Sequence, residues 1–278
     1  LTAPVQHERG IEAPGALNFA PVTARYFRIT PRAPMKIAEA FFHATPRIDG
    51  WDAKAEHLYR PPVAIEKFPT DLRAGDAIDP TRVIDITDRL DESGTLNWTP
   101  PSGRWTILRL GHTTTDHLNV AASDAGRGLE VDKLSAEAVD FQFDNSVRRM
   151  VEAAGRMTGK TFDMLMIDSY EAGLQNWTPK LPAEFRKRAG YAITPYLPAL
   201  TGRIVGDLDV SNRFLFDFRR TLADMMVENY YERLQNHARG AGLRFYAEPY
   251  GPGPFDSLQV SGRVDVPSTE FWTRTPWT

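Results

Sequence analysis

Two carboxylates follow a short apolar run in the segment FDMLMIDSYEAG, residues 162–173. The run at 164–167 is continuous, which is typical of a strand buried on both faces of a parallel sheet. Asp168 and Glu171 come directly after it, where barrels and doubly wound sheets keep their chemistry. Two carboxylates in a partly apolar pocket raise one pKa, which suits a general acid. We therefore predict a shared catalytic site; the alternative for Glu171 is a solvated loop acid that caps the next helix.

Two further strand-like segments also end in an acid. Glu248 lies in YAEPYG between Tyr246 and Tyr250, and Glu270 lies in STEFW. Acids at such positions are candidate catalytic groups, although a buried acid can instead hold loop backbone. Both interpretations stay open for Glu248 and Glu270.

Aromatic and amide side chains accompany these acids. Tyr170, Asn176 and Trp177 lie on or after the loop of the first acids, and Trp272 follows the last strand-like segment. Carbohydrate sites combine aromatic faces with amide groups, so we predict that these four side chains bind substrate. The alternative for each ring is a place in the core.

A charged segment, GLEVDKLS, precedes the first helix of the second half. Glu130 and Asp132 occupy alternate positions at the end of a strand-like segment, followed by Lys133. These acids either belong to the functional site or form a salt bridge that orients the start of the helix.

Several other chemistries are excluded. His112 and His117 do not have zinc-ligand spacing, and the motifs HExxH, GxSxG and GxxxxGK[ST] are absent. Any metal held by the strand-end acids would be a hard ion such as calcium, because calcium takes oxygen ligands.

Strands alternate with helices after residue 125, and this order predicts an α/β fold. The predicted elements are, in chain order, a helix at 136–155 capped by Ser135, a strand at 162–168, a helix at 212–239, and strands at 243–251 and 265–272. Only about half of the eight repeats of a TIM-type barrel fit into this length. Residues 126–278 are therefore predicted to form the N-terminal half of a (β/α) barrel.

The chain before residue 125 has a different pattern. Short alternating segments, separated by proline and glycine, read as strands of an antiparallel sandwich at 24–30, 36–44, 81–87 and 104–113. We therefore predict a partial (β/α) TIM-type barrel preceded by a β-sandwich-like region at 1–125.

Composition limits the class of protein. The 278 residues are 42% hydrophobic and 25% charged, with a net charge of -3 and no cysteine. This small net charge gives no positive electrostatic potential that would attract nucleic acid. The sequence contains no apolar run of about 18 residues that could span a bilayer. We therefore expect neither nucleic acid nor a membrane as a partner. The start at Leu1, without methionine or a leader, indicates a piece of a longer protein.

Several longer strings resemble one enzyme family. GLEVDKLS, IDSYEAGLQNWTP, FLFDFRRTLADMMVENYYERL, FYAEPYG and VPSTEFW are similar to glycoside hydrolase family 106, the α-L-rhamnosidases, from about residue 80 onward. The resemblance implies a large, multidomain, bacterial enzyme with a barrel flanked by sandwich domains. It also implies a calcium-dependent hydrolysis of rhamnosides that inverts the anomeric centre.

The resemblance assigns roles to individual acids. Glu171 matches the general acid, Asp168 the acid that supports it, and Glu270 an acid associated with calcium. An inverting pair needs carboxyls roughly 6.5 to 9.5 Å apart, and Asp168 and Glu171 are too close in sequence to be that pair. The base is therefore expected beyond Thr278, unless Glu248 takes this role.

Two other functions fit the same residues. The chain is a carbohydrate-binding piece without turnover if the barrel is truncated, or a structural barrel whose acids only form salt bridges. Polysaccharide-degrading enzymes are typically periplasmic or secreted, and we expect the same here. Oligomeric state, natural substrate and aglycone do not follow from the sequence.

Overall fold

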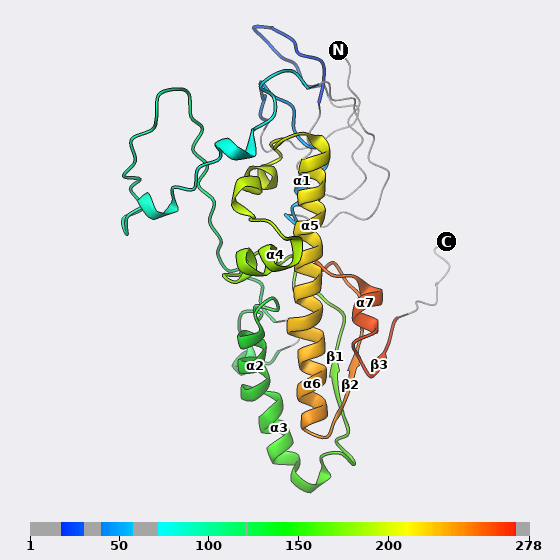
Figure 1. The fold of residues 1–278 in the computed structure, drawn as a ribbon. Coiled ribbons are helices and arrows are strands. Elements are labelled where there is room, and N and C mark those ends of the chain that lie inside the picture. The colour runs from blue at the N-terminus through cyan, green and yellow to red at the C-terminus, as the bar shows by residue number, and fades with distance from the viewer. Residues whose placement is uncertain (1–17, 31–39, 58–71, 120–121, 271–278) are drawn as a thin grey trace, which may run out of the picture. The chain divides into compact units, whose positions relative to one another are not determined.

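The computed structural model describes residues 18–30, 40–57, 72–119 and 122–270, which form helices and one small parallel sheet (Figure 1). The helical elements are α1 (Trp51–Lys54), η1 (Pro80–Arg82), η2 (Thr87–Arg89), η3 (Asp124–Gly126), α2 (Ala136–Asn145), α3 (Val147–Ala154), η4 (Gly155–Met157), α4 (Leu181–Ala189), η5 (Thr194–Thr201), α5 (Leu208–Met226), η6 (Val227–Glu232), α6 (Arg233–Gly240) and α7 (Ser257–Ser261). No helix in these described ranges is both long and apolar enough to cross a membrane.

The described residues divide into two compact units. The first contains residues 18–30, 40–52, 72–99 and Thr194–Leu215, and the second contains 53–57, 100–119, 122–193 and 216–270. All the candidate residues that the structure describes belong to the second unit. The division into two domains at residue 125 stays a prediction.

The sheet of the second unit consists of β1 (Met164–Ile167), β2 (Arg244–Ala247) and β3 (Val266–Pro267), parallel and in that order. Ala247 is in register with both Ile167 and Pro267. The three strands therefore end at the same edge, as the predicted α/β class requires. Their closure into a barrel stays a prediction.

The first strand is less buried than its apolar run predicts. Met166 is 54% exposed, whereas Phe245 and Ala247 of β2 are fully buried. Among the described residues, β1 pairs with β2 along one edge only, and one of its faces is left partly open at Met166. The prediction of burial on both faces is therefore wrong for β1.

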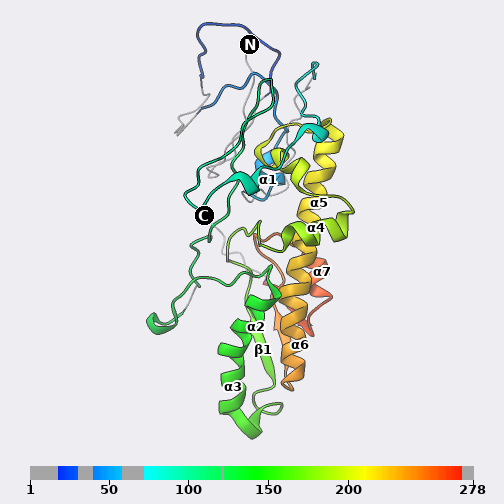
Figure 2. The same cartoon turned by 60° about the vertical axis from the view of Figure 1, so that its left-hand side comes forward.

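Helices α2 and α3 together occupy the predicted helix at 136–155. The Ser135 hydroxyl caps α2 by accepting the Ala138 N–H at 3.3 Å, as predicted. Ser146 interrupts the helix, since its φ of -121° is not helical and its hydroxyl donates to the Gln142 carbonyl. Val139 and Phe143 are buried, and α2 lies beside α6, which also packs on β2 (Figures 1 and 2).

The predicted helix at 212–239 is longer and is not uniform. It begins at Leu208 in α5, widens into the π-helical turn η6, and ends at Gly240 in α6. Gly242 follows with a φ of +77°, which suits glycine at the end of a helix. The apolar spacing predicted the helix but not the π-helical turn.

The strands predicted at 24–30, 81–87 and 104–113 are not formed, and only residues 40–44 of the segment 36–44 are described. Aspartates compete with strand pairing here, because the carboxylates of Asp79, Asp85 and Asp91 each accept the N–H two residues onward. This local bonding replaces the ladder that the alternating pattern predicts. Isolated bridges remain, but the described part of residues 1–125 contains no strand.

Candidate active site

The four predicted strand-end acids all lie at the C-terminal edge of the sheet. Asp168 and Glu171 follow β1, Glu248 follows β2, and Glu270 lies after β3. The loops after β1 and β2 are joined directly, because the Tyr170 N–H donates to the Tyr250 carbonyl at 2.8 Å. The structure therefore brings the loops that carry the acids together at one edge.

Asp168 and Glu171 share a serine. The Ser169 N–H donates to Asp168 Oδ1 at 2.8 Å, and the Ser169 hydroxyl lies 3.5 Å from Glu171 Oε1. Both carboxylates are exposed. They are accessible to a substrate, but the described residues do not enclose Glu171 in the apolar pocket that the sequence suggested.

Tyr170 lies in the core and is only 3% exposed. Its hydroxyl donates to the Gly173 carbonyl at 2.6 Å, and its ring packs edge-on against Phe255 at 5.3 Å. Burial raises the pKa of the Tyr170 hydroxyl, which therefore remains a hydrogen-bond donor. These contacts favour the core alternative for Tyr170 over substrate binding.

The other predicted substrate-binding residues have different surroundings. The Asn176 amide donates to the carbonyls of Ala55 and Glu56 at 3.3 and 3.1 Å, so it holds backbone. Trp177 is half-buried, with its ring 6.2 Å from that of His112. Trp272 lies outside the described residues.

Tyr250 links the acids of two strand ends. Its hydroxyl donates to Glu248 Oε2 at 2.6 Å, and Glu248 is only 9% exposed. Burial raises the pKa of Tyr250, and the hydrogen bond to Glu248 and the charge of Glu270 act in the same direction. The tyrosine therefore stays protonated. The sequence placed Tyr250 beside Glu248 but gave no sign of this bond.

The family model for glycoside hydrolase family 106, described as alpha-L-rhamnosidase, matches residues 12–278. The chain belongs to glycoside hydrolase family 106. The family indicated by the sequence strings is thereby confirmed.

Two proteins show how this family 106 chain relates to others. A protein of Formosa agariphila with the curated name "Putative beta-glucuronidase" is 43% identical over 191 residues, or 69% of this chain. A solved rhamnosidase structure from Novosphingobium sp. PP1Y is 32% identical, with a TM-score of 0.68 over 80% of this chain. The chain spans 16% of the first protein and 22% of the second, so it corresponds to a part of each.

Calcium is the cofactor that the resemblance to family 106 implies. Calcium takes six to eight oxygen ligands. Around the Tyr250 hydroxyl the structure gathers two carboxylates, Glu248 and Glu270, and the described residues contain no group of three or more His, Cys, Asp or Glu side chains that could hold a metal. The described residues alone therefore do not form a calcium site, and the role of Glu270 as a ligand stays a prediction.

The charged segment before α2 contains the salt bridge that was one of its two interpretations. Lys133 Nζ lies 2.5 Å from Glu130 Oε2, and the Asp132 carboxylate accepts the Leu134 N–H and the Thr178 hydroxyl. Lys133 Nζ stands over the ring of Tyr170, 5.6 Å from its centroid, so the salt bridge lies next to the loop that carries Glu171.

One acid near this region was not found from the sequence. Glu56 has a φ of +55°, and burial raises its pKa to about 7, although the charge of Arg219 opposes the shift. Its carbonyl is held by the Asn176 amide. The two residues are 120 positions apart, so no local pattern could have indicated the contact.

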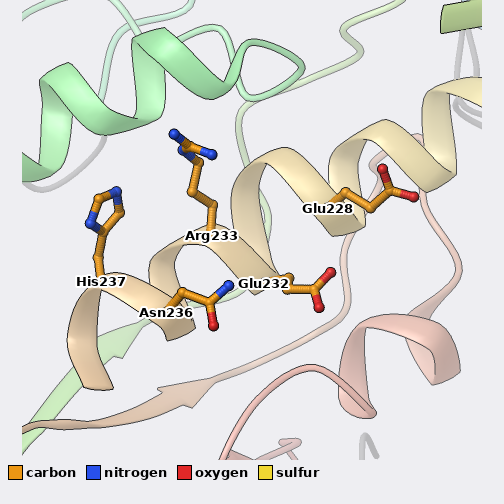
Figure 3. A pocket seen from close by; sticks show the side chains of 5 residues that line it. All are labelled: Glu228, Glu232, Arg233, Asn236 and His237. Carbon is orange, nitrogen blue, oxygen red and sulfur yellow. The ribbon is translucent and has the colours of Figure 1, made fainter. Parts of the chain in front are cut away.

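An open hollow of about 340 Å³ lies on η6 and α6 and is lined by Glu228, Glu232, Arg233, Asn236 and His237. Figure 3 shows Arg233 and His237 extending toward the neighbouring helix. Both are held there by Asp140 of α2, to which His237 Nε2 lies at 2.6 Å. The hollow contains none of the predicted catalytic acids.

Proposed function

We propose that the protein is a glycosidase that removes terminal α-L-rhamnosyl residues from rhamnosides, with inversion at the anomeric carbon. The observation that carries this proposal is the alignment of three parallel strand ends, where the exposed Glu171 and Asp168 lie on a loop bonded to the loop of Glu248. Membership of family 106 and the similarity to a solved rhamnosidase support it.

Two carboxylates perform the reaction. Glu171 donates its proton to the glycosidic oxygen as the bond from that oxygen to the anomeric carbon breaks. A second carboxylate takes a proton from water, and the resulting hydroxide attacks the anomeric carbon from the opposite face. Asp168 lies beside Ser169, which faces both acids, and it supports Glu171.

Four acids are predicted at the sheet edge. Glu171 is proposed as the acid, Asp168 as its support and Glu270 as a calcium ligand, so Glu248 is the remaining candidate for the base. Its carboxylate is nearly buried and already accepts the Tyr250 hydroxyl, so it is poorly placed to receive a proton from water. We therefore propose that the base lies outside the described residues and that Glu248 organises the loop after β2.

A β-glucuronide is the second candidate substrate, because of the name of the Formosa agariphila relative. A glucuronide carries a carboxylate, which needs a cationic partner. The ionised side chains of the described strand-end stretches 168–178, 248–256 and 268–270 are all carboxylates. This charge favours a neutral sugar such as rhamnose.

The test is release of nitrophenol by the full-length protein from p-nitrophenyl α-L-rhamnopyranoside and from p-nitrophenyl β-D-glucuronide. We expect release from the rhamnoside, and a fall of about 100-fold or more in Glu171→Gln if this residue is the general acid. Glu137→Gln, an exposed acid on α2, is the control and should keep its rate.

Three outcomes contradict the proposal. Release from the glucuronide alone would identify a different substrate. A nearly unchanged rate in Glu171→Gln would remove its role as the acid. Binding of rhamnose without any release would favour the carbohydrate-binding alternative.

A further inference from the structure

A buried lysine lies next to a tyrosine of the loop that carries the candidate acid. The Lys133 side chain is 5% exposed and that of Glu130 is 18% exposed. Lys133 Nζ lies 2.5 Å from Glu130 Oε2 and stands over two tyrosine rings, 5.6 Å from the centroid of Tyr170 and 5.3 Å from that of Tyr230. An ammonium over aromatic faces is attracted by the ring quadrupoles.

Stability alone does not account for this arrangement. Removing an ion pair from water is costly, and apolar residues of similar size often stabilise a core equally well. The pair does fix geometry, because the ammonium must remain close to both the carboxylate and the rings.

The π-helical turn η6 supplies one side of this arrangement. Its wider turn allows two consecutive residues, Tyr230 and Tyr231, to be buried together. Tyr230 lies beneath the lysine, while Tyr231 packs on Phe255, which in turn packs on Tyr170. π-Helical turns occur frequently at functional sites.

The backbone around Lys133 is bonded to the same loop. The Lys133 N–H donates to Gln175 Oε1 at 3.1 Å, and the Gln175 amide donates to the Val131 carbonyl at 3.0 Å. The loop at 168–178 is thus held at Gln175 by hydrogen bonds and at Tyr170 by the charge of Lys133. Glu171 lies between these two points.

We propose that Lys133, held in place by Glu130, is a positioning residue for the general acid. It fixes the ring of Tyr170, and the backbone from Tyr170 to Gln175 then presents Glu171 at the edge of the sheet. Lys133 does not touch the substrate. The catalytic part of this inference rests on the proposed function.

The kinetic test uses a double variant, Glu130→Gln with Lys133→Met, which removes both charges and leaves no unpaired buried ion. The matched control is Glu137→Gln with Lys180→Met, because Lys180 and Glu137 form a similar pair whose side chains are 64% and 63% exposed. Rates are compared on 2,4-dinitrophenyl and 4-methoxyphenyl α-L-rhamnosides. The first leaving group departs without protonation, whereas the second needs the acid.

A misplaced acid gives a characteristic pattern. The double variant should lose about tenfold or more on the methoxyphenyl substrate and keep its rate within about threefold on the dinitrophenyl substrate, since general acid catalysis contributes only to the first. The control should match the wild type on both. Equal losses on both substrates, or no loss on either, would overturn the inference.

Hydrogen exchange tests the position of the loop without relying on activity. The Tyr170 N–H is bonded to the Tyr250 carbonyl, so exchange in the peptide 168–178 should become about tenfold faster in the double variant than in the control if the loop loosens. Unchanged exchange would overturn the positioning role. Exchange could also be faster in the double variant while the wild type cleaves neither rhamnoside. That result would uphold the positioning of the loop by Lys133, but it would overturn the proposed function and, with it, the catalytic part of the inference.

Discussion

Gly251 lies against the backbone of Tyr170 so closely that only glycine fits. A Cβ atom at Gly251 would stand 2.1 Å from the Tyr170 carbonyl oxygen and 2.9 Å from its carbonyl carbon. The φ of Gly251 is +127°, which side chains rarely allow. The loops after β1 and β2 can therefore meet only because residue 251 has no side chain.

Gly251→Ala should separate the two loops. We expect the free energy of unfolding to fall by about 2 to 4 kcal/mol, because the new methyl group meets backbone and the conformation disfavours alanine. Urea denaturation measures the change. Gly240→Ala is the control, since Gly240 ends α6 with open space around it, and it should be neutral or slightly stabilising. A similar effect of both substitutions would refute the close approach.

Tyr250→Phe removes the hydroxyl that donates to the nearly buried Glu248 carboxylate. Tyr246→Phe is a matched control, because the Tyr246 hydroxyl meets the uncharged Ser268 hydroxyl at the same distance of 2.6 Å. Hydrogen bonds to charged groups contribute more than neutral ones, so Tyr250→Phe should lower the urea midpoint further than Tyr246→Phe. The reverse order would mean that Glu248 is not held by Tyr250.

The elements predicted correctly are those with a local signal. Ser135 caps α2 because its hydroxyl needs only a nearby N–H. Strands β1 and β2 lie within the predicted segments 162–168 and 243–251, although both are shorter than predicted. The strands predicted before residue 125 failed because alternation does not reveal a missing partner. There, aspartates such as Asp85 satisfy the backbone locally instead.

The site was predictable only in part for the same reason. Acids that follow strand-like segments can be seen in the sequence, so Asp168, Glu171 and Glu248 were found. The Glu130–Lys133 salt bridge was one of the two interpretations of its segment, but its place at the Tyr170 ring and the burial of Glu56 depend on contacts between distant segments. The π-helical turn has no simple apolar period.

Calcium removal tests the cofactor implied by the family resemblance. We predict that a chelator lowers rhamnoside hydrolysis by the full-length protein and that calcium restores it better than magnesium, which demands a stricter octahedral geometry. Glu270→Gln should raise the calcium concentration needed for half of the full rate. Glu92→Gln, an exposed acid of the other unit, should not. Full activity in chelator would remove calcium from the mechanism.

Glu56 should make stability depend on pH. Its pKa rises from 4.5 to about 7 on folding, chiefly through burial, so the folded protein holds this proton more tightly than the unfolded chain. The resulting stabilisation is complete below about pH 4.5 and is lost as the pH rises to about 7; it amounts to at most on the order of 3 kcal/mol. Glu56→Gln should flatten the urea midpoint across this range, and Glu92→Gln should not. Unaltered pH dependence would show that Glu56 ionises normally.

Asp140 should act at lower pH and with the opposite sign. The hydrogen bond from Arg233, assisted by His237, lowers the pKa of Asp140 from 3.8 to about 2, so the carboxylate stabilises the fold above about pH 4 and loses this effect as the pH falls toward 2. Because the pair is partly exposed beside the hollow of Figure 3, we expect Asp140→Asn to cost about 1 kcal/mol at pH 7.

The comparison that isolates this effect uses the same helix. Asp144 of α2 also pairs with an arginine, Arg148, but the two side chains are 49% and 52% exposed. Asp144→Asn should therefore cost less than Asp140→Asn, within about 0.5 kcal/mol of the wild type. Urea denaturation at pH 7 and pH 3 measures both, and the Asp140 variant should approach the wild type at the lower pH. Equal costs at pH 7 would mean that His237 and Arg233 do not depend on Asp140 for their position between α2 and α6.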